Sequence, residues 1–361
     1  VESELVGGEC SYWACMPSKA LLRPGELRAE VERVPGLRPV PEIDVPAVLA
    51  RRDEVIHDLD DSAQIPWLEE RGVTVVRGHA RISAEREVTV GDEVISARKA
   101  VVYAPGSDAA LPPIPGLREA QPWTNREATT AKEPPESMVI LGGGVVGVEL
   151  AQAWQRLGTQ VTLIEGARHL LPNEEVFACE QVTEALRAIG VDVRTERKAA
   201  GVERDGDGLA HVTLDDGSVA TGRVVLAALG RRPRTQDLGH LGIEDGAAIE
   251  VDEHCRHPEH HWLYAIGDVN GRALLTHMGK YQARLAADHI LGKATAIRHG
   301  ADGRQSPRVV FTDPQVSAVG HTSRTAEEAG LNVRCVDIGT SGNAGGSFYG
   351  KDAPGTTRIV I

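Results

Sequence analysis

The pattern of hydrophobic and polar positions is clearest between residues 138 and 165. An apolar run that begins at Met138 predicts a buried strand, because it is short, rich in β-branched residues and followed at once by glycines. Apolar positions at helical spacing come next and end at Gly158. A second apolar run, Gln160–Ile164, stops directly before Glu165. The pattern therefore predicts a strand, a glycine turn, a helix, a second strand and an acid, in that order.

The glycine turn has the spacing of a dinucleotide-binding loop. Gly142, Gly144 and Gly147 form G-x-G-x-x-G, in which the first two glycines allow a tight turn and the close approach of a pyrophosphate to the helix N-terminus. The third glycine allows tight packing of helix on strand, and Glu165 accepts hydrogen bonds from an adenosine ribose. A carboxylate there repels a 2′-phosphate, so NAD(H) is favoured over NADP(H). Arg168 lies only three residues further on and weakens that preference.

A similar order of elements occurs twice along the chain. Residues 209–230 predict a hairpin followed by an apolar strand that ends at Gly230, and residues 87–106 predict the same elements ending at Gly106. We interpret this as two copies of one nucleotide-binding unit, with chance similarity of two hairpins as the alternative.

The first copy is expected to be incomplete. Glu2 is the acid that matches Glu165, which follows Gly142 by 23 residues. The same spacing places the first glycine loop ahead of Val1. The β-branched residues 359–361 also predict that the sequence stops within a strand. We therefore expect a chain truncated at both ends.

Composition narrows the possible functions. A length of 361 residues predicts two or three domains. The net charge of −13 and only 4% aromatic residues argue against a nucleic-acid partner. The most hydrophobic stretch, residues 138–153, contains four glycines and Glu149, so we expect no membrane span.

The five cysteines divide into two groups. Their number is too small and odd for a disulfide scaffold, which favours a reducing, cytoplasmic location. We interpret Cys179, Cys255 and Cys335 as small hydrophobic residues. Cys10 and Cys15 lie five residues apart, and two thiols this close to a nucleotide-binding unit indicate a redox disulfide.

The spacing of Cys10 and Cys15 limits the backbone conformations in which they can form a disulfide. Five residues of ideal helix advance about 7.5 Å, which exceeds the usual Cα separation of a disulfide. The pair therefore requires a helix that starts irregularly. The alternative is two buried, unpaired cysteines.

A further candidate is Asp268, at the end of the short apolar strand 263–266. With Gly267 before it, this carboxylate is suited to bind a polyol chain at the C-terminal end of a strand. The alternative is a turn residue or a helix N-cap. A helix is predicted from Thr276 to Leu291.

The segment around the cysteines resembles a known redox centre. Gly7-Gly8-x-Cys10-x4-Cys15-x-Pro-Ser-Lys19 is similar to the redox centre of the flavin-dependent pyridine nucleotide-disulfide oxidoreductases. Further motifs of that family follow in the same order: Ala104-Pro105-Gly106, the glycine loop with Glu149, Gly230-Arg231-Arg232-Pro233, Tyr264 to Asp268, and Phe311 to Gly320.

The resemblance implies an α/β fold in which a Rossmann-like NAD(P)-binding domain is inserted in a Rossmann-like FAD-binding domain, followed by the start of an α+β dimerisation domain. The implied parts are 1–130 and 246–304 for FAD, 131–245 for NAD(P), and 305–361 for the dimer interface.

The resemblance also implies a path for electrons, between NAD(P)H, FAD and a Cys10–Cys15 disulfide. Cys15 would face the flavin as the charge-transfer thiolate, and Cys10 would exchange with substrate. Lys19, paired with Glu149, would stabilise the reduced flavin. The implied cofactor-binding residues are Glu2 (adenosine ribose of FAD), Asp268 (ribityl chain), Gly7, Gly8, Lys19, Gly106 and Gly267 for FAD, and Gly142, Gly144, Gly147, Glu165, Gly230 and Arg231 around the nicotinamide domain.

The sequence also departs from the family. Ala14 stands where glycine is usual, Tyr12 and Trp13 are expected to narrow access or to stack on a ring substrate, and Pro105 replaces the usual threonine. The first flavin-phosphate loop and the terminal His-Pro segment are missing from the sequence. We interpret the remaining candidates as ordinary local histidines: His277, His299 and His321.

Together these features predict an FAD-dependent NAD(P)-disulfide oxidoreductase most like dihydrolipoamide dehydrogenase. We expect it to act as a homodimer on a small disulfide or dithiol, without a metal, nucleic acid or membrane. Two alternatives stay open: a reductase of another small disulfide, Hg(II) or a quinone, and a catalytically silent NAD-binding remnant.

Overall fold

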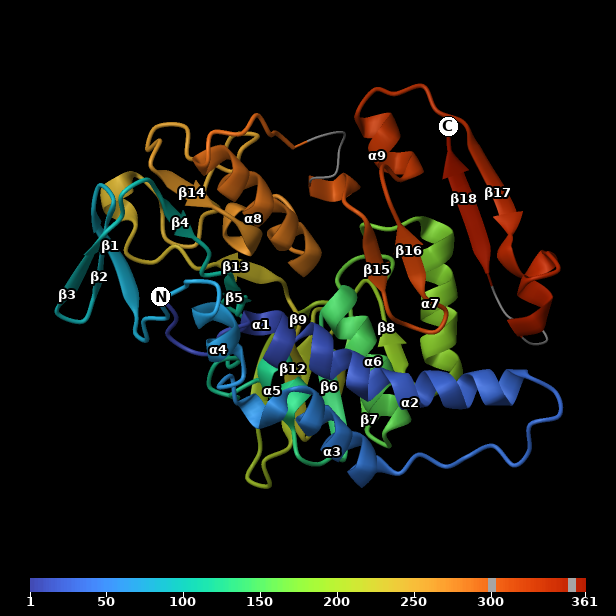
Figure 1. Cartoon of the computed structure of the whole chain (residues 1–361). Helices are drawn as coiled ribbons and strands as arrows, with labels where there is room; N and C mark the ends of the chain where they lie inside the picture. The colour runs from blue at the N-terminus through green and yellow to red at the C-terminus, as the bar shows by residue number, and fades with distance from the viewer. Residues whose placement is uncertain (298–302, 350–354) are drawn as a thin grey trace.

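The computed structural model describes residues 1–297, 303–349 and 355–361. Its centre is a four-stranded parallel sheet in the order β12-β6-β7-β8 (Figure 1). The two strands predicted around the glycine turn are β6 and β7. The four strands have the bounds Ser137–Leu141 (β6), Gln160–Ile164 (β7), Asp192–Arg194 (β8) and Val224–Ala227 (β12).

The two faces of this sheet pack against different layers, because side chains alternate along each strand. Met138 and Ile140 of β6 belong to a cluster shared with helices, whereas Val139 and Leu141 pack with the antiparallel sheet β11-β10-β9. Both faces are buried, which explains the continuous apolar runs in the sequence. The flanking elements are α6 (Val145–Arg156), α7 (Val176–Ala188), β9 (Ala199–Arg204), β10 (Ala210–Leu214) and β11 (Val219–Gly222).

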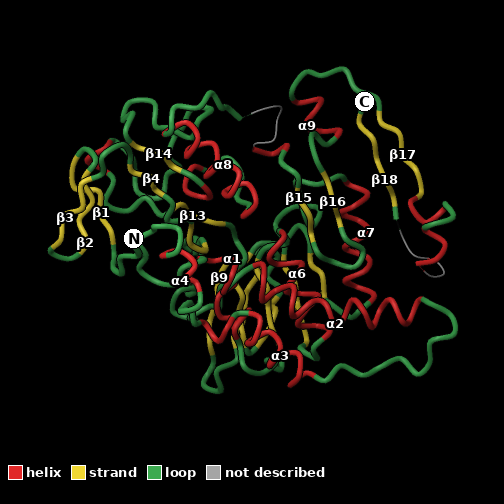
Figure 2. Tube along the Cα trace, viewed as in Figure 1, coloured by secondary structure: helices red, strands yellow, loops and turns green. Residues whose placement is uncertain are grey.

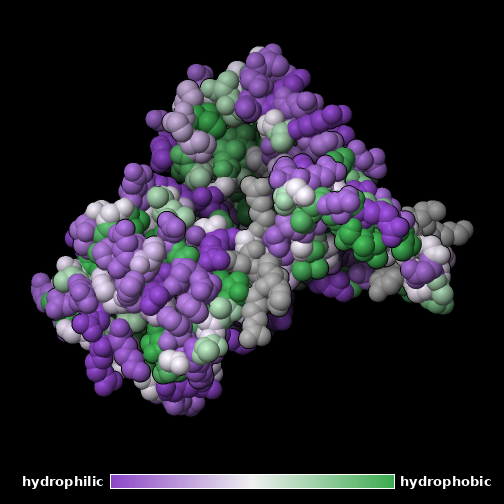
Figure 3. Space-filling view, turned by 90° about the horizontal axis from the view of Figure 1, so that it is seen from above, coloured by the Kyte–Doolittle hydropathy of each residue, from purple (hydrophilic) through white to green (hydrophobic). Residues whose placement is uncertain are grey.

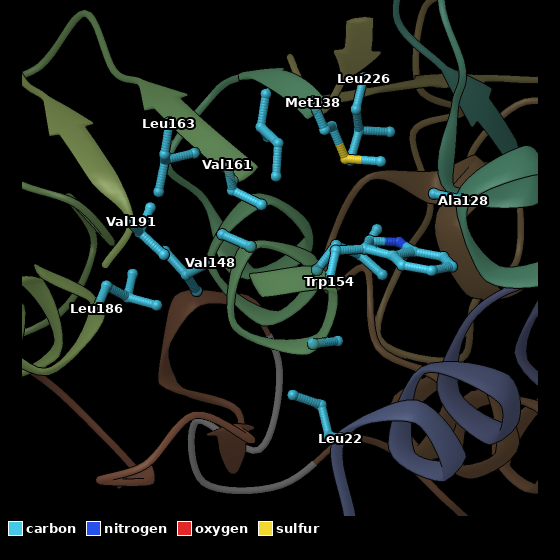
Figure 4. Packing of buried hydrophobic residues seen from close by; sticks show 14 of the residues in the cluster. Leu22, Ala128, Met138, Val148, Trp154, Val161, Leu163, Leu186, Val191 and Leu226 are labelled. Atoms are coloured by element: carbon cyan, nitrogen blue, oxygen red, sulfur yellow. The ribbon is translucent and has the colours of Figure 1, made fainter. Parts of the chain in front are cut away.

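The helical cluster joins the beginning of the chain to this sheet. Leu22, Ala128 and Trp154 belong to this cluster, and Figure 4 shows Ala128 beside the indole of Trp154, which comes from α6 and is fully buried. Cys15 is therefore carried by a helix, α2, that packs on α6 of the nucleotide-binding unit, and Cys10 lies in the preceding helix α1. The N-terminal helices are α1 (Gly8–Tyr12), α2 (Cys15–Arg33), α3 (Val45–Val55), α4 (Gln64–Glu69) and α5 (Asn125–Thr130). A long loop, residues 34–44, connects α2 to α3 (Figure 2).

A second unit is assembled from segments that are far apart in the sequence. β4 pairs in parallel with β14, and β5 pairs with β13, so the chain leaves this unit and returns to it. Glu2 forms a parallel bridge to Arg77. The strands and helix are β1 (Ala80–Ala84), β2 (Glu87–Val90), β3 (Glu93–Ser96), β4 (Val101–Tyr103), β5 (Ser107–Ala109), β13 (Arg231–Pro233), β14 (Leu263–Ala265) and α8 (Thr276–Ile290).

The predicted repeat of hairpins is confirmed. β2 pairs antiparallel with β3, and β10 with β11, as the two similar stretches require. The strands that follow end at Tyr103 and Ala227, three residues before Gly106 and Gly230. The boundaries of the four sequence segments stay a prediction.

The last part of the chain contains two antiparallel pairs. Its elements are β15 (Arg308–Val310), β16 (Val316–Ala318), α9 (Ser323–Glu328), β17 (Cys335–Gly339) and β18 (Thr356–Val360). Apolar side chains such as Ile338 and Ile359 are exposed on the antiparallel pair β17–β18. Figure 3 shows that hydrophobic residues also gather on the right-hand part of the surface. Cys335 is exposed as well, so its interpretation as a packed hydrophobic residue is wrong; Cys179 and Cys255 are buried.

No helix in the described residues is both long enough and apolar enough to cross a membrane.

Candidate active site

The two cysteines lie on either side of a break between helices. α1 ends at Tyr12 and α2 begins at Cys15, while Ala14 between them has φ −134° and ψ −97°, outside the helical region. The irregular start that a close pair requires is therefore present. The thiols of Cys10 and Cys15 are unbridged and hydrogen-bonded to each other.

This hydrogen bond shifts the pKa values of the two thiols in opposite directions. The bond from Cys15 lowers the pKa of Cys10 to about 6, and donating that proton raises the pKa of Cys15. The charges of Lys280 and Lys19 act in the lowering direction, on Cys10 and Cys15 respectively. The reduced pair consequently holds one shared proton at neutral pH, and one sulfur is a nucleophilic thiolate.

Two helices direct their N-termini at the sulfurs. Cys15 is the first residue of α2, and the hydroxyl of Thr276, the first residue of α8, lies 3.6 Å from the Cys15 sulfur. Neither helix has a side-chain cap, so the positive ends of both helix dipoles favour a thiolate. Sequence reasoning missed Thr276, and the predicted start of a helix at that residue was its only signal.

Lys19, one helical turn after Cys15, forms an ion pair with Glu149 of the nucleotide-binding unit. Its Nζ lies 2.6 Å from Oε2 of Glu149, a nearly fully buried residue of α6. The other oxygen, Oε1, accepts a hydrogen bond of 3.0 Å from the backbone N–H of Phe311, and the ring of Phe311 lies 4.6 Å from Nζ. The pair implied by the family resemblance is thus formed, and Phe311 is an unforeseen third partner.

The glycine loop has no room for side chains at two of its positions. Gly142 has φ +104°, and a Cβ on Gly147 would come 1.9 Å from the carbonyl oxygen of Gly142. Gly144 is the N-cap of α6 and faces open space, without a side-chain cap. The helix N-terminus therefore leaves N–H groups available for a pyrophosphate, which fits the dinucleotide expected there.

Glu165 is held in place beside this loop. Oε2 accepts a hydrogen bond of 2.6 Å from the N–H of Gly143, and Oε1 accepts one of 2.7 Å from the N–H of Ala167. Arg168 is exposed. The carboxylate stands where a ribose hydroxyl is expected, with a cation nearby on the surface.

Two glycines implied for the flavin, Gly106 and Gly267, adjoin a contact between Ser107 and Asp268. Oδ2 of Asp268 accepts a hydrogen bond of 2.6 Å from the hydroxyl of Ser107, which in turn accepts one of 2.9 Å from Arg231. Gly106 and Gly267 have φ +77° and +74°, and nothing lies within 4 Å of a Cβ built on either. A carboxylate beside this open glycine surface fits the polyol chain of FAD.

Gly7, Gly8, Gly230 and Glu2 complete the set that the family resemblance implies. Gly7, Gly8 and Gly230 all have positive φ, between +65° and +123°, which favours glycine. Oε1 of Glu2 accepts a hydrogen bond of 2.8 Å from the N–H of Glu4.

The expected role of Tyr12 in substrate access is wrong. Its side chain is 1% exposed, and its hydroxyl donates to the carbonyl of Val6 at 3.1 Å, because the ring fills the space beneath the loop. Trp13 is partly exposed, but Arg126 lies 4.1 Å from its ring centroid. One face of the indole is therefore already covered.

Two of the histidines make local contacts. Nε2 of His277 lies 2.7 Å from the carbonyl oxygen of Pro307, and His321 contacts Gln305 and Thr325. His299 lies outside the described residues. In the described ranges, no group of three or more His, Cys, Asp or Glu side chains is arranged to hold a metal ion.

The fold and the site define a flavoprotein that exchanges electrons between a pyridine nucleotide and a disulfide. The chain belongs to the pyridine nucleotide-disulphide oxidoreductase family, which matches residues 1–286. Enzymes of this family use FAD and NAD(H), and this chain is an FAD-dependent disulfide oxidoreductase most like lipoamide dehydrogenase.

Individual relatives support this assignment. Dihydrolipoyl dehydrogenase of Thermus scotoductus is 34% identical over 347 residues, covering 92% of this chain and 73% of the relative. Mercuric reductase of Staphylococcus aureus is 29% identical, covering 92% and 62%. The structure of LpdA from Mycobacterium tuberculosis superimposes with a TM-score of 0.83 at 26% identity, covering 100% of this chain and 81% of LpdA.

Proposed function

We propose that this chain transfers electrons between NAD(H) and a small dithiol or disulfide of the dihydrolipoamide type, through Cys10 and Cys15. The observation that carries the proposal is the hydrogen-bonded thiol pair, in which Cys15 is the first residue of α2 and lies beside the first residue of α8. Lys19 ties this pair to the α6 helix that begins at the glycine loop, so the thiols and the nucleotide site share one rigid frame.

FAD, when bound, supplies the two-electron relay between nicotinamide and sulfur. The N-terminus of α6 and Glu165 would hold the nicotinamide dinucleotide. Asp268 and Glu2 would hold the ribityl chain and the adenosine ribose of the flavin. Lys19 would supply a fixed positive charge to the bound flavin. Glu149, buried and bonded to Lys19, keeps that ammonium in position.

The exchange with substrate uses the unequal acidity of the thiols. The Cys10 thiolate attacks one sulfur of the substrate disulfide, which forms a mixed disulfide and releases the first substrate thiolate. Cys15, after losing its proton to that thiolate, attacks the Cys10 sulfur, closes the Cys10–Cys15 disulfide and releases the second thiolate. The substrate gains two electrons and the pair loses two; the reverse sequence oxidises a dithiol.

We also infer that the protein acts as a homodimer in a reducing, cytoplasmic compartment. The exposed apolar side chains of the β17–β18 hairpin support the first inference, and the five free thiols support the second. Sedimentation at micromolar concentration would show a mass twice that of the chain; a monomer would contradict the inference.

Absorbance spectra test the proposal directly. The purified chain is expected to be yellow and to gain a long-wavelength band when it is reduced with NADH. Cys10→Ser should keep this band because Cys15 faces the flavin, and Cys15→Ser should abolish it; the opposite result would reverse the two roles. A colourless protein that still binds NADH would replace the proposal with a silent nucleotide binder.

Turnover identifies the substrate class. We expect dihydrolipoamide to be oxidised faster than mycothione, Hg(II) or quinones are turned over in matched assays. Faster reduction of Hg(II) or a quinone would overturn the dithiol assignment while leaving the thiol pair as the redox centre.

A further inference from the structure

The irregular turn between the two cysteines is held from outside by a short helix. The carbonyl oxygen of Trp13 accepts a hydrogen bond of 2.8 Å from Nδ2 of Asn125 and one of 3.1 Å from the hydroxyl of Thr129. Both donors belong to α5 and are buried, at 6% and 1% exposure. Buried donors of this kind are seldom left without an acceptor, so their loss carries a penalty.

The same amide group reaches the other side of Cys10. Nδ2 of Asn125 also donates to Oε1 of Glu9 at 3.0 Å. One nitrogen thus contacts the residue before Cys10 and the residue three positions after it. Glu9 is bound in addition by Arg126, whose Nη2 lies 2.9 Å from Oε2.

The orientation of Asn125 is fixed from its oxygen end. Oδ1 accepts a hydrogen bond of 3.0 Å from Arg231, which also donates to Ser107, the partner of Asp268. The amide therefore cannot rotate without breaking this contact as well. A continuous set of hydrogen bonds runs from the cysteine turn to the carboxylate proposed for the ribityl chain.

The hydrogen bonds from Asn125 and Thr129 to the Trp13 carbonyl, here called the clamp, prevent α1 and α2 from joining into one continuous helix. If α1 and α2 merged into one regular helix, the Cα atoms of the cysteines would lie about 7.5 Å apart along the axis. That spacing exceeds the usual separation in a disulfide. A clamped carbonyl at Trp13 keeps Ala14 out of the helical region and so keeps the sulfurs together.

We propose that Asn125 and Thr129 are positioning residues of the redox pair: α5 holds the Trp13–Ala14 turn in the geometry in which Cys10 and Cys15 join. The proposal rests on the redox function proposed above for the two thiols. According to this proposal, α5 shifts the equilibrium between the Cys10–Cys15 dithiol and disulfide towards the disulfide, although no group of α5 takes part in the reaction.

Thr129→Val and Thr130→Val are the matched test. Both replace a threonine of α5 with an isosteric residue. Both hydroxyls approach the carbonyl of Arg126 within the same helix, at 3.4 Å and 2.7 Å, but among the described residues only that of Thr129 also donates to Trp13. The equilibrium between dithiol and disulfide is measured in flavin-free chain, in a Cys335→Ser background, against a dithiothreitol buffer. Thr129→Val should shift it about threefold to tenfold towards the dithiol, and Thr130→Val less than twofold.

Further variants separate positioning from loss of folding. Asn125→Asp removes the donors facing Trp13 and Glu9 and should shift the equilibrium in the same direction, whereas Thr129→Ser retains the hydroxyl and should restore the wild-type value. Urea denaturation of each variant shows that the compared chains are folded.

If folded Thr129→Val and Thr130→Val chains had the same dithiol–disulfide equilibrium constant, the proposed role of α5 would be wrong. A different result would contradict the proposed redox function. In that case the wild-type chain would form no Cys10–Cys15 disulfide in the buffer and would show no long-wavelength band with flavin.

Discussion

The two nucleotide-binding units hold their acids in related but unequal ways. In both, Oε1 of the glutamate accepts a hydrogen bond from the N–H two residues further on, at 2.7 Å for Glu165 and 2.8 Å for Glu2. Only Glu165 also binds a glycine-loop N–H, that of Gly143. Within the described residues, the second oxygen of Glu2 has no hydrogen-bond partner.

The difference concerns where each unit obtains its parts. The unit proposed for the nicotinamide has its site residues in one stretch, residues 137–167, so strand, loop, helix and acid are in register through local folding. The unit proposed for the flavin gathers Ser107, Arg231, Asp268 and Thr276 from four separate segments. We therefore expect changes in the first unit to act locally, and changes in the second to spread to the thiols.

The largest effect is expected from Gly147→Ala. The new Cβ would meet the carbonyl oxygen of Gly142 at 1.9 Å, so β6 and α6 must separate. We expect NADH binding to weaken about 100-fold and the free energy of unfolding to fall by about 1–3 kcal/mol. Fluorescence titration and urea denaturation measure both, and Gly206→Ala, in open space, is the control. Unchanged binding would contradict the assignment of the loop.

Asp268→Ala should act on the other unit. Removing the carboxylate leaves the Ser107 hydroxyl without its acceptor and takes away the proposed ribityl contact. We expect the Kd for FAD to rise about 30-fold with NADH binding unchanged, measured by flavin fluorescence. A parallel loss of both nucleotides would mean that the two units are not separable.

The thiol pair predicts a pH dependence. Because the hydrogen bond from Cys15 lowers the pKa of Cys10 to about 6, the rate of Cys10 alkylation should rise about tenfold from pH 5 to pH 7 and then level off. Below pH 6 the thiolate is protonated and the rate falls. Iodoacetamide labelling of the reduced chain, with Cys10→Ser as the blank, measures it. A midpoint near pH 8.5 would mean that the hydrogen bond is not formed.

The smallest effects are expected from the paired variants Glu165→Gln and Glu2→Gln. Each keeps one oxygen acceptor but removes the charge. We expect Glu165→Gln to weaken NADH binding about fivefold and to narrow the preference over NADPH, and Glu2→Gln to weaken FAD binding about threefold. Isothermal titration with all three nucleotides distinguishes them. An effect of Glu165→Gln on FAD instead would reverse the assignment of the units.

The strands of the central sheet could be predicted because their pattern is local. β7 has the bounds expected from the sequence, Gln160–Ile164, since an apolar run buried on both faces leaves a clear signal. The Lys19–Glu149 pair followed from a family motif rather than from spacing, as the two residues are 130 positions apart.

Other contacts had no local signal. Thr276, Phe311 and Asn125 lie far along the chain from the groups that they touch, and each occupies an ordinary position at a helix start or after a strand. Tyr12 was predicted wrongly for a related reason. An aromatic ring between two cysteines is equally compatible with facing solvent or the core, and only the packed loop decides between them.

Helix α6 has a practical consequence for engineering nucleotide specificity. Over twelve residues, or about 18 Å, it begins at the glycine loop, contacts Lys19 and Phe311 through Glu149 and, near its end, contacts Asp313 through Gln152 and Arg156. A transplanted dinucleotide-binding module that lacked these three side chains would bind its coenzyme but lose its alignment with the sulfurs. Grafts should therefore transfer the loop and retain the helix face that carries Glu149, Gln152 and Arg156.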